Sequence, residues 1–106
     1  MNKFIAILKD KRKGSLTTEL LNQHVEHLRT LTKAGHMFLC GPFKDNDGAL
    51  QVIMANSKLE AEAFLNKDPF IREKYYQGYD LFELIEANDA NNWLLEDAQT
   101  KLNSKV

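Results

Sequence analysis

Two histidines and one aspartate are the residues of this sequence best suited to acid–base chemistry. His24 and His27 lie in the stretch LLNQHVEHL, and Asp68 lies further on in NKDPF. Imidazole changes its charge near neutral pH, so it can both accept and return a proton. A carboxylate beside it can accept a hydrogen bond from one ring nitrogen and thereby fix the tautomer. This combination suits proton transfer to or from a small substrate.

The helix expected around the two histidines makes His24 the stronger candidate. At about 100° per residue, one broad apolar face is formed by Leu20, Leu21, Val25, Leu28 and Leu31. His24 falls near the middle of that face and His27 at its edge. A titratable group in a core-facing stripe costs desolvation free energy unless it finds a partner. His24 is therefore either paired for function or a core-edge histidine bonded to a backbone carbonyl, and the residues alone leave both interpretations open.

Other motifs have simple structural interpretations or are missing. Asp68 before Pro69 is also the pattern of a helix N-cap, which needs no catalytic explanation. His24 and His27 have no third ligand at the spacing of a metal motif, so we expect no metal site. Cys40 fits a buried strand residue. Phosphate-binding glycine loops, nucleophile elbows and dinucleotide fingerprints are not found, and we expect no cofactor.

Composition predicts a single small domain in the cytoplasm. The chain has 106 residues, of which 43% are hydrophobic and 27% charged, and its net charge is −1. That balance gives no electrostatic reason to expect a nucleic-acid partner. The one cysteine favours a reducing compartment. The apolar run near the start is too short for a signal peptide or a membrane span, so we expect no membrane partner.

The order of elements predicts an α+β fold of the ferredoxin-like type, β-α-β-β-α-β. Strands are expected at 4–8, 37–40, 50–54 and 79–85, and helices at about 17–34 and 57–65. Gly41-Pro42 should end the second strand, and Asp47-Gly48 should supply a positive φ in the following turn. We assign 1–86 to this domain and 87–106 to a C-terminal helical extension.

Such a fold leaves one sheet face without helices, and we expect a second subunit to cover it. The side chains expected on that face are Ile5, Ile7, Val52 and Leu81. The expected partner is therefore a second copy of this chain, in a homodimer to which the region around Trp93 adds contacts.

The sequence resembles the YciI-like (YCII) family over about 1–86. The resemblance rests on the order and spacing of HVEHL at 24–28, Gly35, Gly41-Pro42, Gly48 and Asp68-Pro69-Phe70. His24 matches the histidine of the family's H-L-x-Y-L pattern, whereas His27 takes the place of its aromatic residue. The resemblance implies a dimer of the dimeric α/β-barrel type, with a histidine–aspartate dyad in a pocket between helix and sheet. One branch of the family resembles a dehydrochlorinase that removes HCl from a chlorinated hydroxyquinol.

These observations favour a small cofactor-independent enzyme, a lyase or an isomerase, that acts on a cyclic or enolisable substrate. His24 and Asp68 would form its acid–base dyad, and His27, Phe43 and Phe70 would contact the substrate. One alternative is a non-catalytic dimeric module that binds a small molecule in the same pocket. Another is an interaction domain in which His24 is only structural. The distance between His24 and Asp68, and open volume beside them, separate these possibilities.

Overall fold

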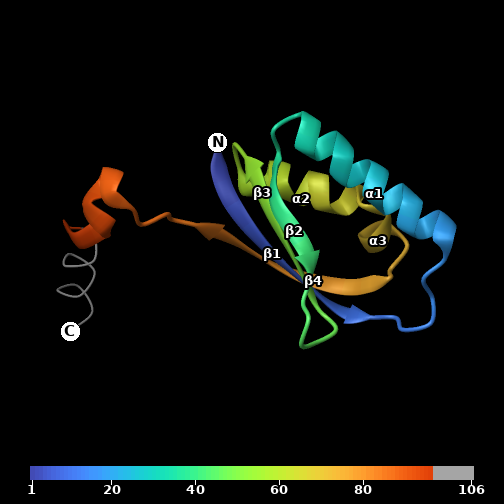
Figure 1. Cartoon of the computed structure of the whole chain (residues 1–106). Helices are drawn as coiled ribbons and strands as arrows, with labels where there is room; N and C mark the ends of the chain where they lie inside the picture. The colour runs from blue at the N-terminus through green and yellow to red at the C-terminus, as the bar shows by residue number, and fades with distance from the viewer. Residues whose placement is uncertain (97–106) are drawn as a thin grey trace.

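The computed structural model describes residues 1–96, and Figure 1 shows the arrangement of its helices and strands. The elements in chain order are β1 (Asn2–Lys11), α1 (Thr18–Lys33), β2 (Met37–Pro42), β3 (Ala49–Ala55), α2 (Lys58–Lys67), α3 (Pro69–Arg72), β4 (Tyr76–Leu84) and the 3-10 segment η1 (Asp89–Leu94). The expected alternation β-α-β-β-α-β is observed, with the single turn of α3 added before the last strand.

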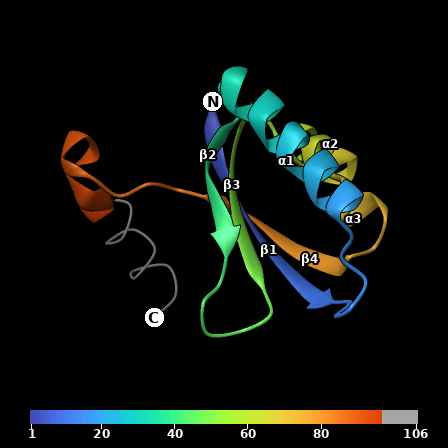
Figure 2. The ribbon, with the colours of Figure 1, turned by 45° about the vertical axis from the view of Figure 1, so that its right-hand side comes forward.

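The four strands form one antiparallel sheet in the order β2-β3-β1-β4. All three α-helices lie on the same side of this sheet, as both ribbon views show (Figures 1 and 2). The other side carries no α-helix in either view, and the short 3-10 segment η1 lies away from the α-helices. The fold is therefore a mixed α/β arrangement of two layers, and the face of the sheet without helices is called the open face below.

The core lies between the helices and the two central strands. Along β1, Phe4, Ala6 and Leu8 are buried, whereas the intervening Ile5 and Ile7 are half-buried on the open face. This alternation follows from the period of two in a strand, which sends successive side chains to opposite faces. The apolar helix-facing residues of β1 pack with Ile53 of β3 and Leu65 of α2 in one cluster. Burial of this cluster is the main stabilising contribution to the domain.

The prediction that Leu81 lies on the open face is wrong. Leu81 is paired with Ala6 of β1, so it shares the helix-covered face and belongs to the core cluster. Phe82, the next residue, is paired with Ile5 and takes the open-face position. The two residues differ by one position, and a shift of one residue in a strand exchanges its two faces.

Capping residues define the helix ends close to where the sequence suggests. The Thr17 side chain accepts a hydrogen bond from the Leu20 N–H and caps α1, and Ser57 does the same for α2 with the Glu60 N–H. After α1, Gly35 adopts a φ of +81°, the left-handed conformation that ends many helices. The local sequence therefore determines where these helices begin and where α1 stops.

The strands extend beyond their predicted limits. β1 runs from Asn2 to Lys11, and β4 begins at Tyr76 rather than Tyr79. β2 continues through Pro42, which pairs with Ala49 of β3. Proline is tolerated here because β2 is an edge strand and its other side has no ladder that needs the missing N–H.

The turn between β2 and β3 needs Gly48 for a reason other than the one predicted. Within residues 1–96, the glycines with positive φ are Gly14 and Gly35, so the expected positive φ at Asp47-Gly48 is wrong. Instead, a Cβ at Gly48 would lie 3.0 Å from the backbone oxygen of Leu8 and 3.1 Å from the Phe43 ring. Gly48 is therefore fixed by the close approach of β1 and the turn.

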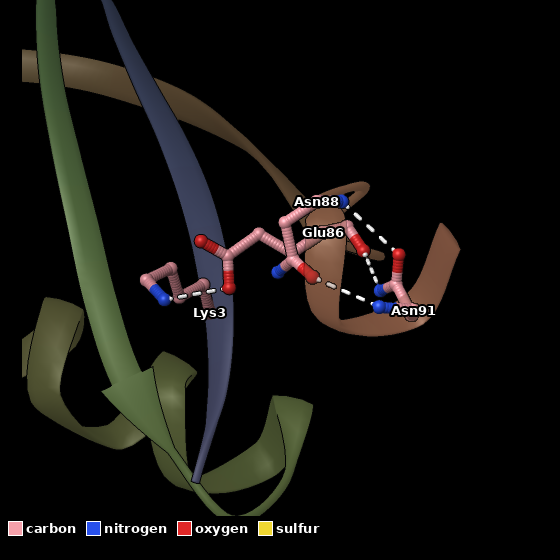
Figure 3. Close-up of polar contacts among 4 residues, drawn as sticks. All are labelled: Lys3, Glu86, Asn88 and Asn91. Carbon is pink, nitrogen blue, oxygen red and sulfur yellow. Dashed lines mark hydrogen bonds and ion pairs between the residues drawn. The ribbon is translucent and has the colours of Figure 1, made fainter. Parts of the chain in front are cut away.

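A polar contact joins the chain after β4 to the central strand β1, and further polar contacts fold that chain onto itself (Figure 3). Lys3 Nζ lies 2.8 Å from Glu86 Oε2, and the Asn91 side-chain amide donates to the backbone oxygen of Glu86 at 2.7 Å. Asn88 and Asn91 also exchange side-chain-to-backbone hydrogen bonds as a capping box at the start of η1. Of the helical extension predicted over 87–106, η1 is the helical part seen up to residue 96, and the remainder lies outside the described residues.

We predict that Gly48→Ala destabilises the fold by about 1–3 kcal/mol, because the added methyl group presses on the rigid backbone of β1. Gly41→Ala is the matched control, since a Cβ at Gly41 meets no atom within 4 Å. Urea unfolding of both variants checks the difference. Equal stability of the two variants would show that the turn moves away from β1 without cost.

Candidate functional site

A cleft of about 400 Å³ opens between α1 and the helix-covered face of the sheet. Its walls are contributed by β1, α1, β2, β3, α3 and the residues just before and within β4. Most of these wall residues are apolar. The residues that line it are Leu8, Lys11, Leu16, Leu21, His24, Val25, Leu28, Cys40, Gly41, Pro42, Ala49, Leu50, Gln51, Phe70, Tyr75 and Tyr76. The cleft can therefore hold a small, mainly apolar molecule beside a few polar groups.

His24 lines this cleft and is paired with Asp68. The Nδ1 atom of His24 lies 2.7 Å from Oδ1 of Asp68, within the range of a strong hydrogen bond. Helix α1 provides the histidine, and the junction between α2 and α3 provides the aspartate. The fold thus brings together the two residues that the sequence suggested as an acid–base pair, and the cleft adjoins them.

Asp68 is fully buried, and both of its carboxyl oxygens accept hydrogen bonds. Oδ1 accepts from His24 Nδ1 and from the backbone N–H of Phe70 at 2.9 Å, and Oδ2 accepts from Gln51 Nε2 at 2.8 Å. The bond to Phe70 is the N-cap of α3, with Pro69 in the first helical turn. Asp68 is therefore both a helix cap and the partner of His24.

The surroundings of Asp68 determine its charge. Burial by itself raises the pKa of the carboxyl, but the hydrogen bond and charge of His24, with the donors of Gln51 and Phe70, bring that pKa below its ordinary value. Asp68 is consequently a carboxylate at neutral pH and can only accept hydrogen bonds. The shared proton then resides on His24 Nδ1. Nε2 of neutral His24 is left with its lone pair.

Phe70 fixes the plane of the His24 ring. The two rings are nearly parallel, at 5° between planes, and their centroids are 3.7 Å apart. The Tyr75 ring also packs against the Phe70 ring, and the two ring centroids are 4.7 Å apart. An aromatic ring below the imidazole restrains its rotation, and its negative face attracts an imidazolium. Phe70 thus supports the orientation that the hydrogen bond to Asp68 imposes.

The sequence of this chain matches a known protein family. The model of the YCII-related domain matches residues 3–85, which span α1, both β-hairpin strands and the junction that carries Asp68. The chain belongs to the YCII family. Curated proteins gave no significant match.

A solved structure similar to this YCII chain is that of 5-chloro-2-hydroxyhydroquinone dehydrochlorinase from Burkholderia phenoliruptrix, in complex with 2,5-dihydroxybenzoquinone. The two share 21% sequence identity, and the match covers 84% of this chain and 99% of the other, with a TM-score of 0.63. At this level of identity the likeness establishes the shared fold. Within residues 1–96, no helix of the YCII chain is long and apolar enough to cross a membrane.

Gln51 is a residue of the site that the sequence analysis missed. It lies on β3, is only 2% exposed and donates to Asp68. The signal was present as a single polar residue among the apolar neighbours Leu50, Val52 and Ile53. Gln51 pairs with Ala6 on the helix-covered face, where a polar side chain is buried and needs a hydrogen-bond partner.

Of the three residues expected to contact a substrate, only Phe70 lines the cleft. His27 is one turn further along α1, away from the cleft lining, and its Nε2 is buried without a hydrogen-bond partner in the described part of the chain. Burial lowers the pKa of His27, although the Asp68 charge partly opposes this effect. Phe43 lies in the β2–β3 turn, where its ring is near Gly48. Helical and turn geometry therefore separate these two side chains from His24.

Cys40 and two tyrosines add further functional groups to the cleft. Cys40 is exposed, contrary to the buried position expected, and lies on the edge strand β2 at the wall of the cleft. Partial desolvation at the cleft, reinforced by the Asp68 charge, nevertheless raises the pKa of the Cys40 thiol, which opposes a role as thiolate nucleophile. Tyr75 and Tyr76 are buried and contact Phe70. In the part of the chain that the structure describes, no three His, Cys, Asp or Glu residues are grouped to hold a metal ion.

We predict that Asp68 makes the stability of the fold depend on pH below its ordinary pKa of 3.8. Because its folded-state pKa is lowered, the carboxylate stabilises the fold fully above that value, and this contribution is lost as the pH falls through the folded-state pKa. Asp68→Asn should therefore lose less stability than the wild type as the pH falls below 3.8.

Urea unfolding at several pH values measures this difference. Asp45→Asn, in the exposed β2–β3 turn, serves as the control and should keep the wild-type dependence. If Asp68→Asn and the wild type lose stability in parallel, folding does not lower the pKa of Asp68.

Proposed function

We propose that this YCII protein is a small enzyme in which His24 and Asp68 act as an acid–base dyad. The observation that carries the proposal is the 2.7 Å contact between His24 Nδ1 and the buried Asp68 carboxylate at the wall of an apolar cleft. A fully buried aspartate that caps α3 would not require a titratable partner. Its pairing with a cleft-lining histidine is the arrangement that a general base needs.

In the proposed mechanism, Nε2 of neutral His24 removes a proton from the bound substrate. In an elimination, the electron pair left behind forms a new π bond and the leaving group departs with the electrons of its own bond. In an isomerisation, no group leaves and the electron pair is delocalised into the neighbouring π system of the substrate. Asp68 stays ionised and stabilises the imidazolium that forms, because its carboxylate accepts the Nδ1 hydrogen bond throughout. The imidazolium then releases its proton to water or, in an isomerisation, to another atom of the substrate. Neither route consumes a cofactor.

The walls of the cleft support a small planar ring as substrate. Phe70, Tyr75 and Leu28 offer apolar and aromatic surface, and Lys11 adds a positive charge that attracts a phenolate or enolate. The similar structure is that of a dehydrochlorinase with a dihydroxybenzoquinone bound. We therefore propose elimination or isomerisation of a hydroxylated or enolisable ring as the reaction class, and the cytoplasm as its location, in keeping with the unpaired Cys40.

We predict that His24→Ala and Asp68→Asn each reduce turnover of such a ring substrate by about 10²–10⁴-fold. His24→Ala removes the base, and Asp68→Asn removes the charge that stabilises the imidazolium. His36→Gln is the matched control, because His36 bonds to the Met54 carbonyl and does not line the cleft.

The measurement combines a thermal-shift search over phenols, quinones and lactones with turnover assays of the compounds that bind. A ligand that binds only the folded state raises the free energy of unfolding by RT ln(1 + [L]/Kd), so binding is detected without knowledge of the reaction. Binding that is never followed by turnover would favour the alternative of a non-catalytic small-molecule-binding module.

We also propose that the unit 1–86 is a ferredoxin-like domain that pairs with a second copy through the open face, as in a dimeric α/β-barrel, and that 87–106 is an extension. Large apolar side chains support this proposal: Phe82 is 59% and Phe38 58% exposed on that side. The chain after β4 leaves on the same side in both ribbon views, away from the helices (Figures 1 and 2). Trp93 of this segment is exposed and available to the partner. An apolar surface of this kind is typical of a buried interface.

We predict a homodimer at micromolar concentration in light scattering, and a monomer for Phe82→Asp, because the charge would be buried in the interface. Leu59→Asp is the matched control: Leu59 is 77% exposed on α2, on the helix layer, and its replacement should leave the dimer intact. A monomeric wild type, or a dimer unaffected by Phe82→Asp, would contradict pairing through this face.

A further inference from the structure

The amide oxygen of Gln51 is a buried acceptor without a donor. Gln51 lines the cleft, yet its Oε1 atom has no hydrogen-bond partner among the described residues. Cys40, the residue paired with Gln51 across β2 and β3, also lines the cleft but makes no hydrogen bond to it within residues 1–96. An unsatisfied buried acceptor costs about 1–3 kcal/mol, so its retention in a small core needs an explanation.

The orientation of the Gln51 amide follows from its neighbour. Asp68 Oδ2 lies 2.8 Å from Nε2 of Gln51, and an ionised carboxylate only accepts hydrogen bonds. The NH₂ group must therefore face Asp68, and a reversed amide would bring two acceptors together. As a result Oε1 is fixed as an acceptor that the protein itself does not use.

Gln51 and His24 are linked through one carboxylate. His24 bonds to Oδ1 of Asp68 and Gln51 to Oδ2, so the two side chains are held at neighbouring positions of the same cleft. Among residues 1–96, no group donates to Oε1 of the amide or to Nε2 of the imidazole, and the neutral ring can accept a hydrogen bond at Nε2. Both acceptors are backed by the same buried charge, and neither can turn away without breaking its bond to Asp68.

We propose that Gln51 is a specificity-determining residue whose Oε1 accepts a hydrogen bond from a second hydroxyl group of the substrate. The substrate class is then a ring with two hydroxyl groups, one of which lies at His24 Nε2 and the other at Gln51 Oε1. This inference rests on the proposed function, since it concerns the ligand of the same cleft. A site that supplies an acceptor discriminates strongly against a ligand without the matching donor, because the acceptor then stays unpaired.

The test compares phenol with the three dihydroxybenzenes, catechol, resorcinol and hydroquinone, as ligands of the full chain. Dissociation constants are measured by calorimetry for the wild type and for Gln51→Met, which keeps the length of the side chain and removes the amide. At least one dihydroxy isomer should bind the wild type about tenfold more tightly than phenol. In Gln51→Met this advantage should fall to about twofold, the statistical benefit of two equivalent hydroxyls.

The ratio separates the acceptor from the other role of Gln51. Loss of the donor to Asp68 affects phenol and its dihydroxy analogues alike, whereas loss of Oε1 affects only the analogues. Gln77→Met is the matched control, because Gln77 is an exposed strand residue that bonds to the Asp10 carbonyl and does not line the cleft. It should keep the wild-type ratio.

Each outcome bears on a defined claim. If no isomer binds the wild type better than phenol, or if the advantage survives in Gln51→Met, the role of Gln51 is overturned while the proposed function stands. If neither phenol nor any dihydroxybenzene binds the wild type, the role of Gln51 is overturned, and the proposed function is then decided by the turnover assays of quinones and lactones with His24→Ala and Asp68→Asn. The wild-type comparison with phenol tests the inference even if Gln51→Met does not fold.

Discussion

The rest of this structure depends on one buried charge, the carboxylate of Asp68. An ionised group in a protein interior is tolerated only where hydrogen bonds and an opposite charge replace water. Here the replacements come from three separate parts of the chain: the His24 ring on α1, the Gln51 amide on β3 and the backbone N–H of Phe70 on α3. Satisfying this carboxylate therefore brings α1, the sheet and the α2–α3 junction together at one point, next to the cleft.

The same buried carboxylate determines which atoms of its neighbours are donors and which are acceptors. Because Asp68 can only accept, both neighbours must turn a donor toward it, and each then presents its remaining acceptor elsewhere. Phe70 contributes twice, with its backbone to Asp68 and its ring to His24. Structural and chemical roles are thus carried by the same atoms. A substitution at this point changes helix capping, ring orientation and charge together, so single effects have to be separated with matched variants.

The sequence predicted the central pair but not its full surroundings. His24 stood out because a titratable group in an apolar helical stripe is anomalous, and Asp68 because of its Asp-Pro pattern and the family resemblance. Gln51 was missed because one polar residue in a short apolar strand resembles ordinary alternation. The position of Leu81 was wrong because the face of a strand residue depends on register, which sequence leaves undetermined by one position. His27 and Phe43 were expected to contact the substrate, but helix and turn geometry place them outside the cleft lining.

The central position of β1 has a consequence for how the chain folds. β1 is synthesised first, yet it pairs with β3 and with β4, up to the contact of Lys3 with Leu84. Closing such long loops is entropically costly, and a high proportion of distant pairings slows folding. During synthesis, both edges of β1 stay unpaired until β3 has emerged from the ribosome, and the edge that pairs with β4 stays unpaired until residue 84 has emerged. Lys3, Lys9 and Lys11 place positive charges along the unpaired strand. Repulsion between such charges opposes premature association with other nascent chains.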